Sequence, residues 1–150
     1  MTDKNGWRIV LIDDEEGIRR VTRITLEDAG YTVFTADNGK NGLALCEEAH
    51  PQIVITDVRM PGMDGIAVLE TVKKNFPDIE VIVATAFGEM DLAIRALQLD
   101  ASDFITKPLH SEALAVALER ARARFEDRKQ LKDYTTFLEK GWNDTTRELM

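Results

Sequence analysis

The stretch Ile53-Val54-Ile55-Thr56-Asp57 is a short apolar run that ends at a carboxylate. Three other runs also end beside a polar or charged side chain. Ile9-Val10-Leu11-Ile12 precedes Asp13 and Asp14, Val81-Ile82-Val83-Ala84 precedes Thr85, and Phe104-Ile105-Thr106 precedes Lys107. Apolar runs of this length, separated by helix-length amphipathic segments, are typical of buried parallel strands. The sequence therefore predicts an α/β fold built on a parallel sheet.

The order of elements is strand and then helix, repeated five times. The patterns predict strands near 7–12, 32–36, 53–56, 80–85 and 103–106, and helices near 16–29, 39–49, 65–75, 89–99 and from 111 onward. The run 32–36 mixes polar and apolar residues, as an edge strand can, whereas 9–12, 53–55 and 81–84 are continuously apolar. With right-handed crossovers, these features favour a doubly wound sheet of strand order 2-1-3-4-5.

Composition narrows the class of function. The 150 residues carry a net charge of -8, which argues against non-specific nucleic-acid binding and against a basic membrane-surface role. A single cysteine, Cys46, excludes a disulfide within the chain. We find no signal peptide and no apolar run long enough to span a membrane, so a cytoplasmic protein is the expectation.

The C-terminal part differs from the rest in charge and pattern. Residues 1–118 carry a net charge of -9 and residues 119–150 a net charge of +1. No proline or glycine interrupts 111–140, and a helix of that length would span roughly 45 Å. We therefore expect a domain over 1–122, a helical linker over 123–150 and an output module beyond residue 150.

Apolar residues recur along this helix at alternating spacings of three and four, first Leu114, Leu118, Ala121 and Phe125, then Leu131, Tyr134, Leu138 and Trp142. Such a seam indicates a helix that pairs with another helix, as in a coiled-coil homodimer. A solvated helical linker with scattered apolar residues is the alternative.

The carboxylates at the strand ends predict a cation site, because ligands bind at the carboxyl ends of strands in open α/β sheets. Two unit charges about 4 Å apart repel by about 4 kcal/mol at an effective dielectric of 20, so Asp13, Asp14 and Asp57 would favour a bound cation. Oxygen ligands point to Mg²⁺. Beside such an ion, Asp57 could attack phosphorus, while Thr85 and Lys107 could contact phosphate oxygens. Taken singly, each residue has an ordinary structural explanation, such as acids favoured at a helix N-terminus.

Four motifs together resemble the receiver domain of two-component response regulators: Ile12-Asp13-Asp14-Glu15, Asp57-Val58-Arg59-Met60-Pro61-Gly62-Met63-Asp64-Gly65, Ala84-Thr85-Ala86 and Phe104-Ile105-Thr106-Lys107-Pro108. The match covers roughly residues 7–122. The resemblance implies a flavodoxin-like (βα)5 fold and a phosphoacceptor, not a classical enzyme. It also implies that a histidine kinase donates the phosphoryl group. The parent protein would be either a response regulator or a hybrid kinase.

The resemblance implies a role for each matching residue. Asp57 would accept the phosphoryl group. Asp14, Asp57 and the backbone carbonyl of Arg59 would ligate Mg²⁺, and Asp13 would act on the ion through water. Thr85 and Phe104 would form the switch that alters the surface of the fourth helix, fifth strand and fifth helix. The peptide bond between Lys107 and Pro108 would be cis. Asp100 stands where the family usually has glycine; if the backbone there needs a positive φ, Asp tolerates it better than most residues do.

Two other functions remain open from the sequence. A flavodoxin-like interaction module that works without phosphorylation would keep the fold but not need the acids, Thr85 or Lys107. A haloacid-dehalogenase-like phosphatase also uses Asp, Thr, Lys and Mg²⁺, but it normally has a second Asp two residues after the nucleophile, where this chain has Arg59. No helix-turn-helix pattern is present, so direct nucleic-acid binding by these 150 residues is not expected.

Overall fold

A computed structural model describes the backbone of residues 6–149 and the side chains as far as Gly141. Its elements alternate as expected: β1 (Arg8–Ile12), α1 (Glu16–Asp28), β2 (Thr32–Ala36), α2 (Gly39–Ala49), β3 (Ile53–Asp57), α3 (Gly65–Asn75), β4 (Glu80–Thr85), α4 (Met90–Gln98), β5 (Asp103–Thr106) and α5 (Ser111–Leu149). The bounds of the strands and of the first four helices agree with the sequence prediction to within one residue.

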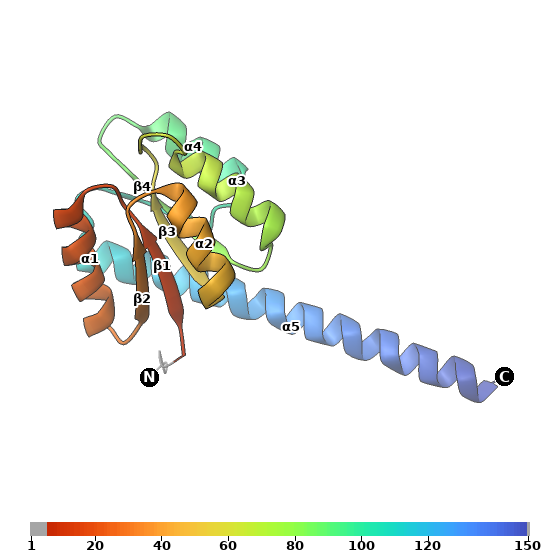
Figure 1. The fold of residues 1–150 in the computed structure, drawn as a ribbon. Helices are drawn as coiled ribbons and strands as arrows, with labels where there is room; N and C mark the ends of the chain where they lie inside the picture. The colour runs from red at the N-terminus through yellow and green to blue at the C-terminus, as the bar shows by residue number, and fades with distance from the viewer. Residues whose placement is uncertain (1–5, 150) are drawn as a thin grey trace.

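All five strands are parallel and lie in the order β2-β1-β3-β4-β5, which confirms the predicted doubly wound sheet (Figure 1). The register sets Ile12 beside Thr56, Asp57 beside Ala84, and Thr85 beside Thr106. The strands therefore end at nearly the same level, and the polar residues that follow them share one edge of the sheet.

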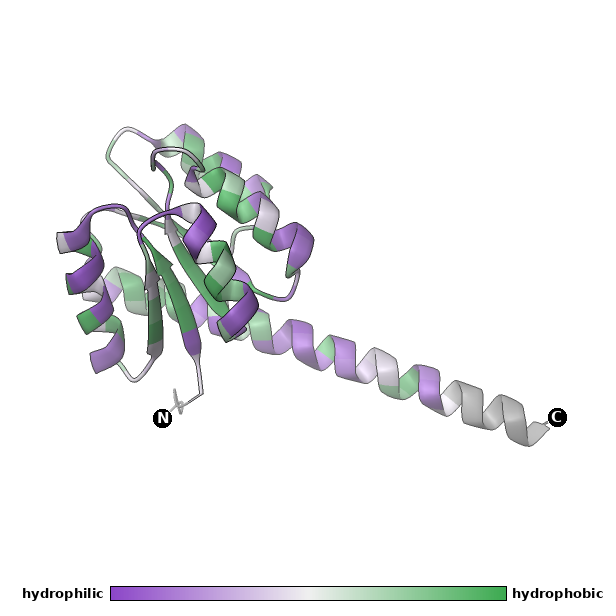
Figure 2. Cartoon of the chain, viewed as in Figure 1, coloured by the Kyte–Doolittle hydropathy of each residue, from purple (hydrophilic) through white to green (hydrophobic). Residues whose placement is uncertain are grey.

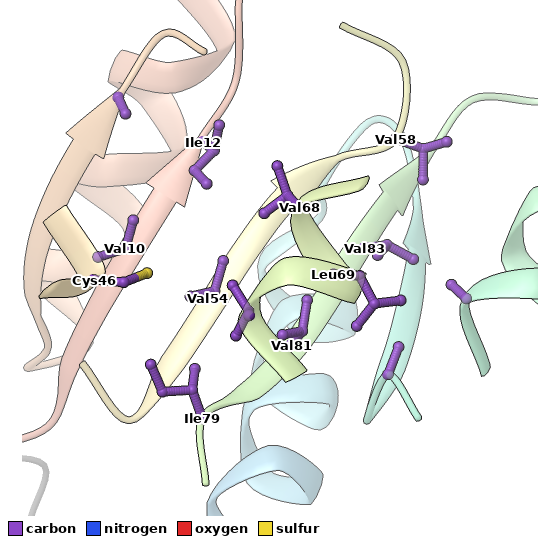
Figure 3. Packing of buried hydrophobic residues seen from close by; sticks show 14 of the residues in the cluster. Val10, Ile12, Cys46, Val54, Val58, Val68, Leu69, Ile79, Val81 and Val83 are labelled. Carbon is purple, nitrogen blue, oxygen red and sulfur yellow. The ribbon is translucent and has the colours of Figure 1, made fainter. Parts of the chain in front are cut away.

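Successive residues of each strand point to opposite faces, so the sheet has two apolar layers. One layer joins β1, β3 and β4 to α2, α3 and α4 through Val10, Val54, Val81, Cys46 and Leu69 (Figure 3). The other layer joins the same strands to α1 and α5 through residues such as Ile9, Ile55, Leu26 and Leu114. Because β3 and β4 are covered on both faces, they are buried along their whole length.

Helix α5 begins as part of the domain and then leaves it (Figure 1). Leu114, Leu118 and Ala121 are buried against the sheet, so the first half of the seam serves the chain's own core. In the tail, Leu131, Tyr134 and Leu138 are exposed on a largely hydrophilic helix (Figure 2). The backbone stays helical past Gly141, and the side chain of Trp142, the last predicted seam position, lies outside the described residues.

Asp100, in the turn between α4 and β5, has φ 73°, so the backbone there is left-handed. Asp tolerates this region better than most residues because its short polar side chain can bond locally. Among residues 6–149, no helix is both long and apolar enough to cross a membrane.

Candidate functional site

Three carboxylates gather at the carboxyl end of the sheet. Asp13 and Asp14 follow β1, Asp57 ends β3, and each offers an oxygen that lies within 4.8 Å of the others. Asp13 and Asp57 are buried, whereas Asp14 is exposed. The strand order itself produces this cluster, because β1 and β3 are neighbours in the sheet although 40 residues of chain lie between them.

Lys107 enters the same site from the other side. Its ammonium donates a hydrogen bond to Oδ2 of Asp57 at 2.7 Å and lies 3.3 Å from Oδ2 of Asp13. The Lys107–Pro108 peptide is cis, and the Lys107 amide donates to the carbonyl of Thr85 at 2.7 Å. The loop after β5 is thereby tied to the end of β4, with the lysine directed at the acids.

The backbone around Asp57 leaves no room for a side chain at Gly65. A Cβ added there would lie 2.1 Å from the carbonyl oxygen of Asp57 and 2.7 Å from Cα of Val58. The Gly65 amide donates to the Val58 carbonyl at 2.8 Å, and Asp64 caps α3 through the amide of Ala67. The close approach of α3 to β3 therefore holds Asp57 in place and requires glycine.

Burial and charge act against each other in this cluster. Burial raises the pKa of Asp57 and the neighbouring Asp13 adds to the rise, while Lys107 and the amide of Arg59 oppose it, leaving the pKa above its ordinary value. Burial lowers the pKa of Lys107, but the hydrogen bond to Asp57 and the charges of Asp13 and Asp57 outweigh burial and raise it. The lysine is therefore held as a cation, and ionisation of Asp57 is costly without a further cation.

The remaining predicted site residues also lie around Asp57. The Arg59 amide is 3.4 Å from Oδ1 of Asp57, a long hydrogen bond, and the Arg59 side chain is exposed. Thr85 is buried at the end of β4. Phe104 is partly buried and packs against the core layer formed with α2, α3 and α4.

Glu89, just before α4, is a residue that the sequence reasoning missed. Its buried carboxylate accepts a hydrogen bond from the amide of Ala86 at 2.7 Å and pairs with the guanidinium of Arg59. It thus connects the loops that follow β3 and β4. Its only signal in the sequence is an acid near a helix start, which is common on helices that have no site.

The donor set fits Mg²⁺. Three carboxylates within reach of one another provide hard oxygen ligands, and the exposed position of Asp14 leaves the site open to solvent on one side. Bound there, Mg²⁺ would offset the charge of the acids and of an incoming phosphoryl group.

Comparison with known proteins shows similarity over most of the chain. Residues 9–119 match the response regulator receiver domain family. Among curated proteins, the chain is 36% identical over 120 residues to the DNA-binding transcriptional regulator NtrC of Salmonella typhimurium, covering 80% of this chain and 26% of that protein. It is 32% identical over 135 residues to the regulatory protein AtoC of Escherichia coli, covering 90% of this chain and 29% of that protein.

Solved structures show the same likeness. A receiver domain protein from Clostridium thermocellum superposes with a TM-score of 0.76 at 32% identity, covering 83% of this chain and 98% of that one. NtrX from Brucella abortus, solved with ADP, superposes with a TM-score of 0.81 at 30% identity, covering 85% of this chain and 29% of that one.

The chain spans between a quarter and a third of the length of the two curated relatives described above. The strand order of the structure is the one expected for the family that matches residues 9–119. The chain belongs to the response regulator receiver domain family.

Proposed function

We propose that this chain is a Mg²⁺-dependent phosphoacceptor that takes a phosphoryl group from a histidine kinase onto Asp57. An Oδ of Asp57 forms the new bond to phosphorus as the P–N bond of a kinase phosphohistidine breaks, and the bonding electron pair returns to the imidazole nitrogen. The observation that carries the proposal is the contact between Lys107 and Asp57 inside a cluster of three acids. Unless it holds a cation, such a cluster is electrostatically unfavourable.

The chain's own residues have distinct tasks in this step. Asp13, Asp14, Asp57 and the carbonyl of Arg59 hold the ion. The pKa of Lys107 is already raised, so its ammonium stays charged and pairs with a phosphoryl oxygen. The Thr85 hydroxyl donates to another oxygen, and Phe104 repacks behind it, so that phosphorylation changes the surface formed by α4, β5 and α5.

The kinase approaches the site beside Lys107. A groove between α1 and the loop after β5 is lined by apolar and polar residues that include Ile18, Val21, Thr22, Lys107, Pro108 and Leu109. Val21 is 64% exposed, an apolar side chain available to a partner helix. A histidine presented along this groove would lie next to the site.

We further propose that residues 1–122 form the receiver unit and that 123–150 form a helical linker to an output module, with the exposed tail as a homodimer contact. The curated relatives extend well beyond the matched region, which supports an output module. A cytoplasmic location follows from a kinase donor that works inside the cell.

Intact mass after incubation with Mg²⁺ and acetyl phosphate tests the phosphoacceptor proposal. The wild-type chain should gain one phosphoryl group, and Asp57→Asn and a chelated sample should gain none. A purified histidine kinase that carries a labelled phosphohistidine serves as the second donor. If neither donor modifies the chain, the interaction module that works without phosphorylation is favoured instead.

A further inference from the structure

A second charged cluster lies at the opposite end of the sheet from Asp57. Glu80, the first residue of β4, is fully buried, and neither of its carboxylate oxygens has a hydrogen-bond partner among the described residues. Its charge is balanced by three cations: Lys73 Nζ at 3.9 Å, Arg124 Nε at 3.6 Å and Arg128 Nη2 at 3.3 Å. Because a buried carboxylate without a counter-charge is strongly unfavourable, Glu80 requires these cations to stay in place.

Asp100 shares the same three cations. It accepts a hydrogen bond from Arg124 at 2.7 Å and lies 3.5 Å from Arg128 and 3.8 Å from Lys73. Asp100 sits directly after α4, in the turn where its φ is 73°. The end of α4 is therefore linked by charge to two arginines of α5.

The two arginines stand where α5 leaves the domain. Arg124 and Arg128 are one helical turn apart and face the domain, and Lys132 continues the row by pairing with Asp78 at 3.3 Å. Arg124 also donates to the carbonyl of Ala101 at 3.2 Å, and Arg128 donates to the carbonyl of Pro77. Among the described side chains of α5, Ala121 is the last buried apolar one. Beyond it, Phe125 packs edge-on against Trp7, and Arg124, Arg128 and Lys132 make the polar contacts with the domain.

We propose that Glu80, Asp100, Lys73, Arg124 and Arg128 form a charge clamp that fixes the direction in which α5 leaves the domain and passes a displacement of α4 to the tail. The fixed direction of α5 follows from these contacts alone. The transmission of a displacement to the tail rests on the proposed function, in which phosphorylation of Asp57 alters α4. A displacement of Asp100 would change its pairing with both arginines, which are rigidly joined to the tail by one helix.

The direction of the tail can be measured as a distance between two spin labels. Labels at Glu48→Cys on α2 and Thr136→Cys on the tail use exposed positions, and Cys46 stays unlabelled because burial raises the pKa of its thiol to about 11. The full chain is diluted with unlabelled chain so that only distances within one molecule contribute. A single narrow distance distribution is expected for the labelled chain.

Two variants test the clamp, and one serves as a control. Glu80→Gln removes the buried charge. Arg128→Gln removes one of its three partners at a position that is 30% exposed, and it leaves Lys73 and Arg124 beside Glu80. Each should abolish the single narrow distribution. Arg120→Gln removes another α5 arginine, which pairs with Asp103 at 3.1 Å and is exposed, and it should leave the distribution unchanged. An unchanged distribution in both Arg128→Gln and folded Glu80→Gln would overturn the clamp.

The coupling is tested with acetyl phosphate and Mg²⁺. Phosphorylation should shift the wild-type distance, and Asp100→Asn, which keeps a hydrogen-bond acceptor and tolerates positive φ, should lose that shift while gaining the same phosphoryl mass. A phosphorylated wild type with an unshifted distance would contradict the coupling. Absence of the mass gain would instead contradict the proposed function and the coupling with it, while the distances in unphosphorylated variants would still decide the clamp.

Discussion

Lys107 donates to Asp57 at 2.7 Å, yet this one ammonium faces three carboxylates that lie within 4.8 Å of one another. The pair therefore leaves the site with excess negative charge. That imbalance favours a bound cation, and without one it makes the site a source of instability.

Asp57→Asn should stabilise the unliganded chain by about 1 kcal/mol at pH 7, because it removes one buried charge while Lys107 keeps its contact with Asp13. The folded-state pKa of Asp57 is raised, so ionisation costs stability as pH rises through that pKa. The gain should therefore vanish when pH falls below the ordinary value of 3.8. Urea unfolding with a chelator present at both pH values measures it.

Glu48→Gln, at an exposed position of α2, is the matched control and should change the free energy of unfolding little at either pH. Equal stability of Asp57→Asn and wild type at pH 7 would mean that the acid cluster is not under electrostatic strain.

Lys107→Met should destabilise the chain by about 1–3 kcal/mol in chelator, because it leaves buried carboxylate oxygens of Asp13 and Asp57 without their partner. Mg²⁺ should restore much of that loss, since a ligand present at 100 times its dissociation constant adds about 2.7 kcal/mol. Thermal unfolding with and without Mg²⁺ gives both quantities. A Lys107→Met chain as stable as wild type in chelator would show that the ion pair does not stabilise the fold.

Gly65→Ala should destabilise the chain by about 1–3 kcal/mol, whereas Gly17→Ala should not destabilise it. The new Cβ at position 65 would meet the backbone of Asp57 and Val58, which cannot move without displacing the Asp57 side chain. Nothing lies within 4 Å of a Cβ at Gly17, so alanine there should be neutral or stabilising by up to about 1 kcal/mol. Urea unfolding of both variants measures the difference, and a Gly65→Ala chain as stable as Gly17→Ala would show that α3 can retreat from β3.

The strands and the phosphoacceptor region were predictable because their signals are local. Strands buried on both faces must be apolar throughout, and a parallel sheet must bring its carboxyl ends to one edge. Asp13, Asp57 and Lys107 follow such runs, so their convergence could be inferred before any coordinates.

The remaining features depend on contacts between distant parts of the chain. Glu80 is the first residue of an apolar strand, and nothing near it in sequence indicates that Arg124 and Arg128 balance its charge. The seam of α5 was predicted only in part. Leu114 and Leu118 pack on the chain's own sheet, and the same spacing of apolar residues serves a sheet or a partner helix.

Asp100→Asn should destabilise the chain by about 0.5 kcal/mol at pH 7, a small figure because the Asp100 side chain is 58% exposed. Burial raises the pKa of Asp100, but the hydrogen bond and charge of Arg124, with the charges of Lys73 and Arg128, outweigh it and lower the pKa. A lowered pKa gives stability above the ordinary value of 3.8 that is lost as pH falls through the folded-state pKa.

The difference between Asp100→Asn and wild type should therefore shrink as the solution is acidified, which chemical unfolding at a series of pH values follows. Asp127→Asn, exposed on α5, controls for a general loss of surface charge. A difference that grows at low pH would contradict the pairing with the arginines.

Tyr134→Asp should convert a tail-mediated dimer to monomer. Leu131, Tyr134 and Leu138 are 66%, 60% and 50% exposed and lie on one face of the tail, where a second copy of the helix would bury them. A charge placed in that seam would remain without a partner in the dimer. Thr136→Asp adds the same charge to another exposed face and should leave the dimer intact. Light scattering after size exclusion distinguishes the two masses, and a wild-type chain that is monomeric at high concentration would contradict tail pairing.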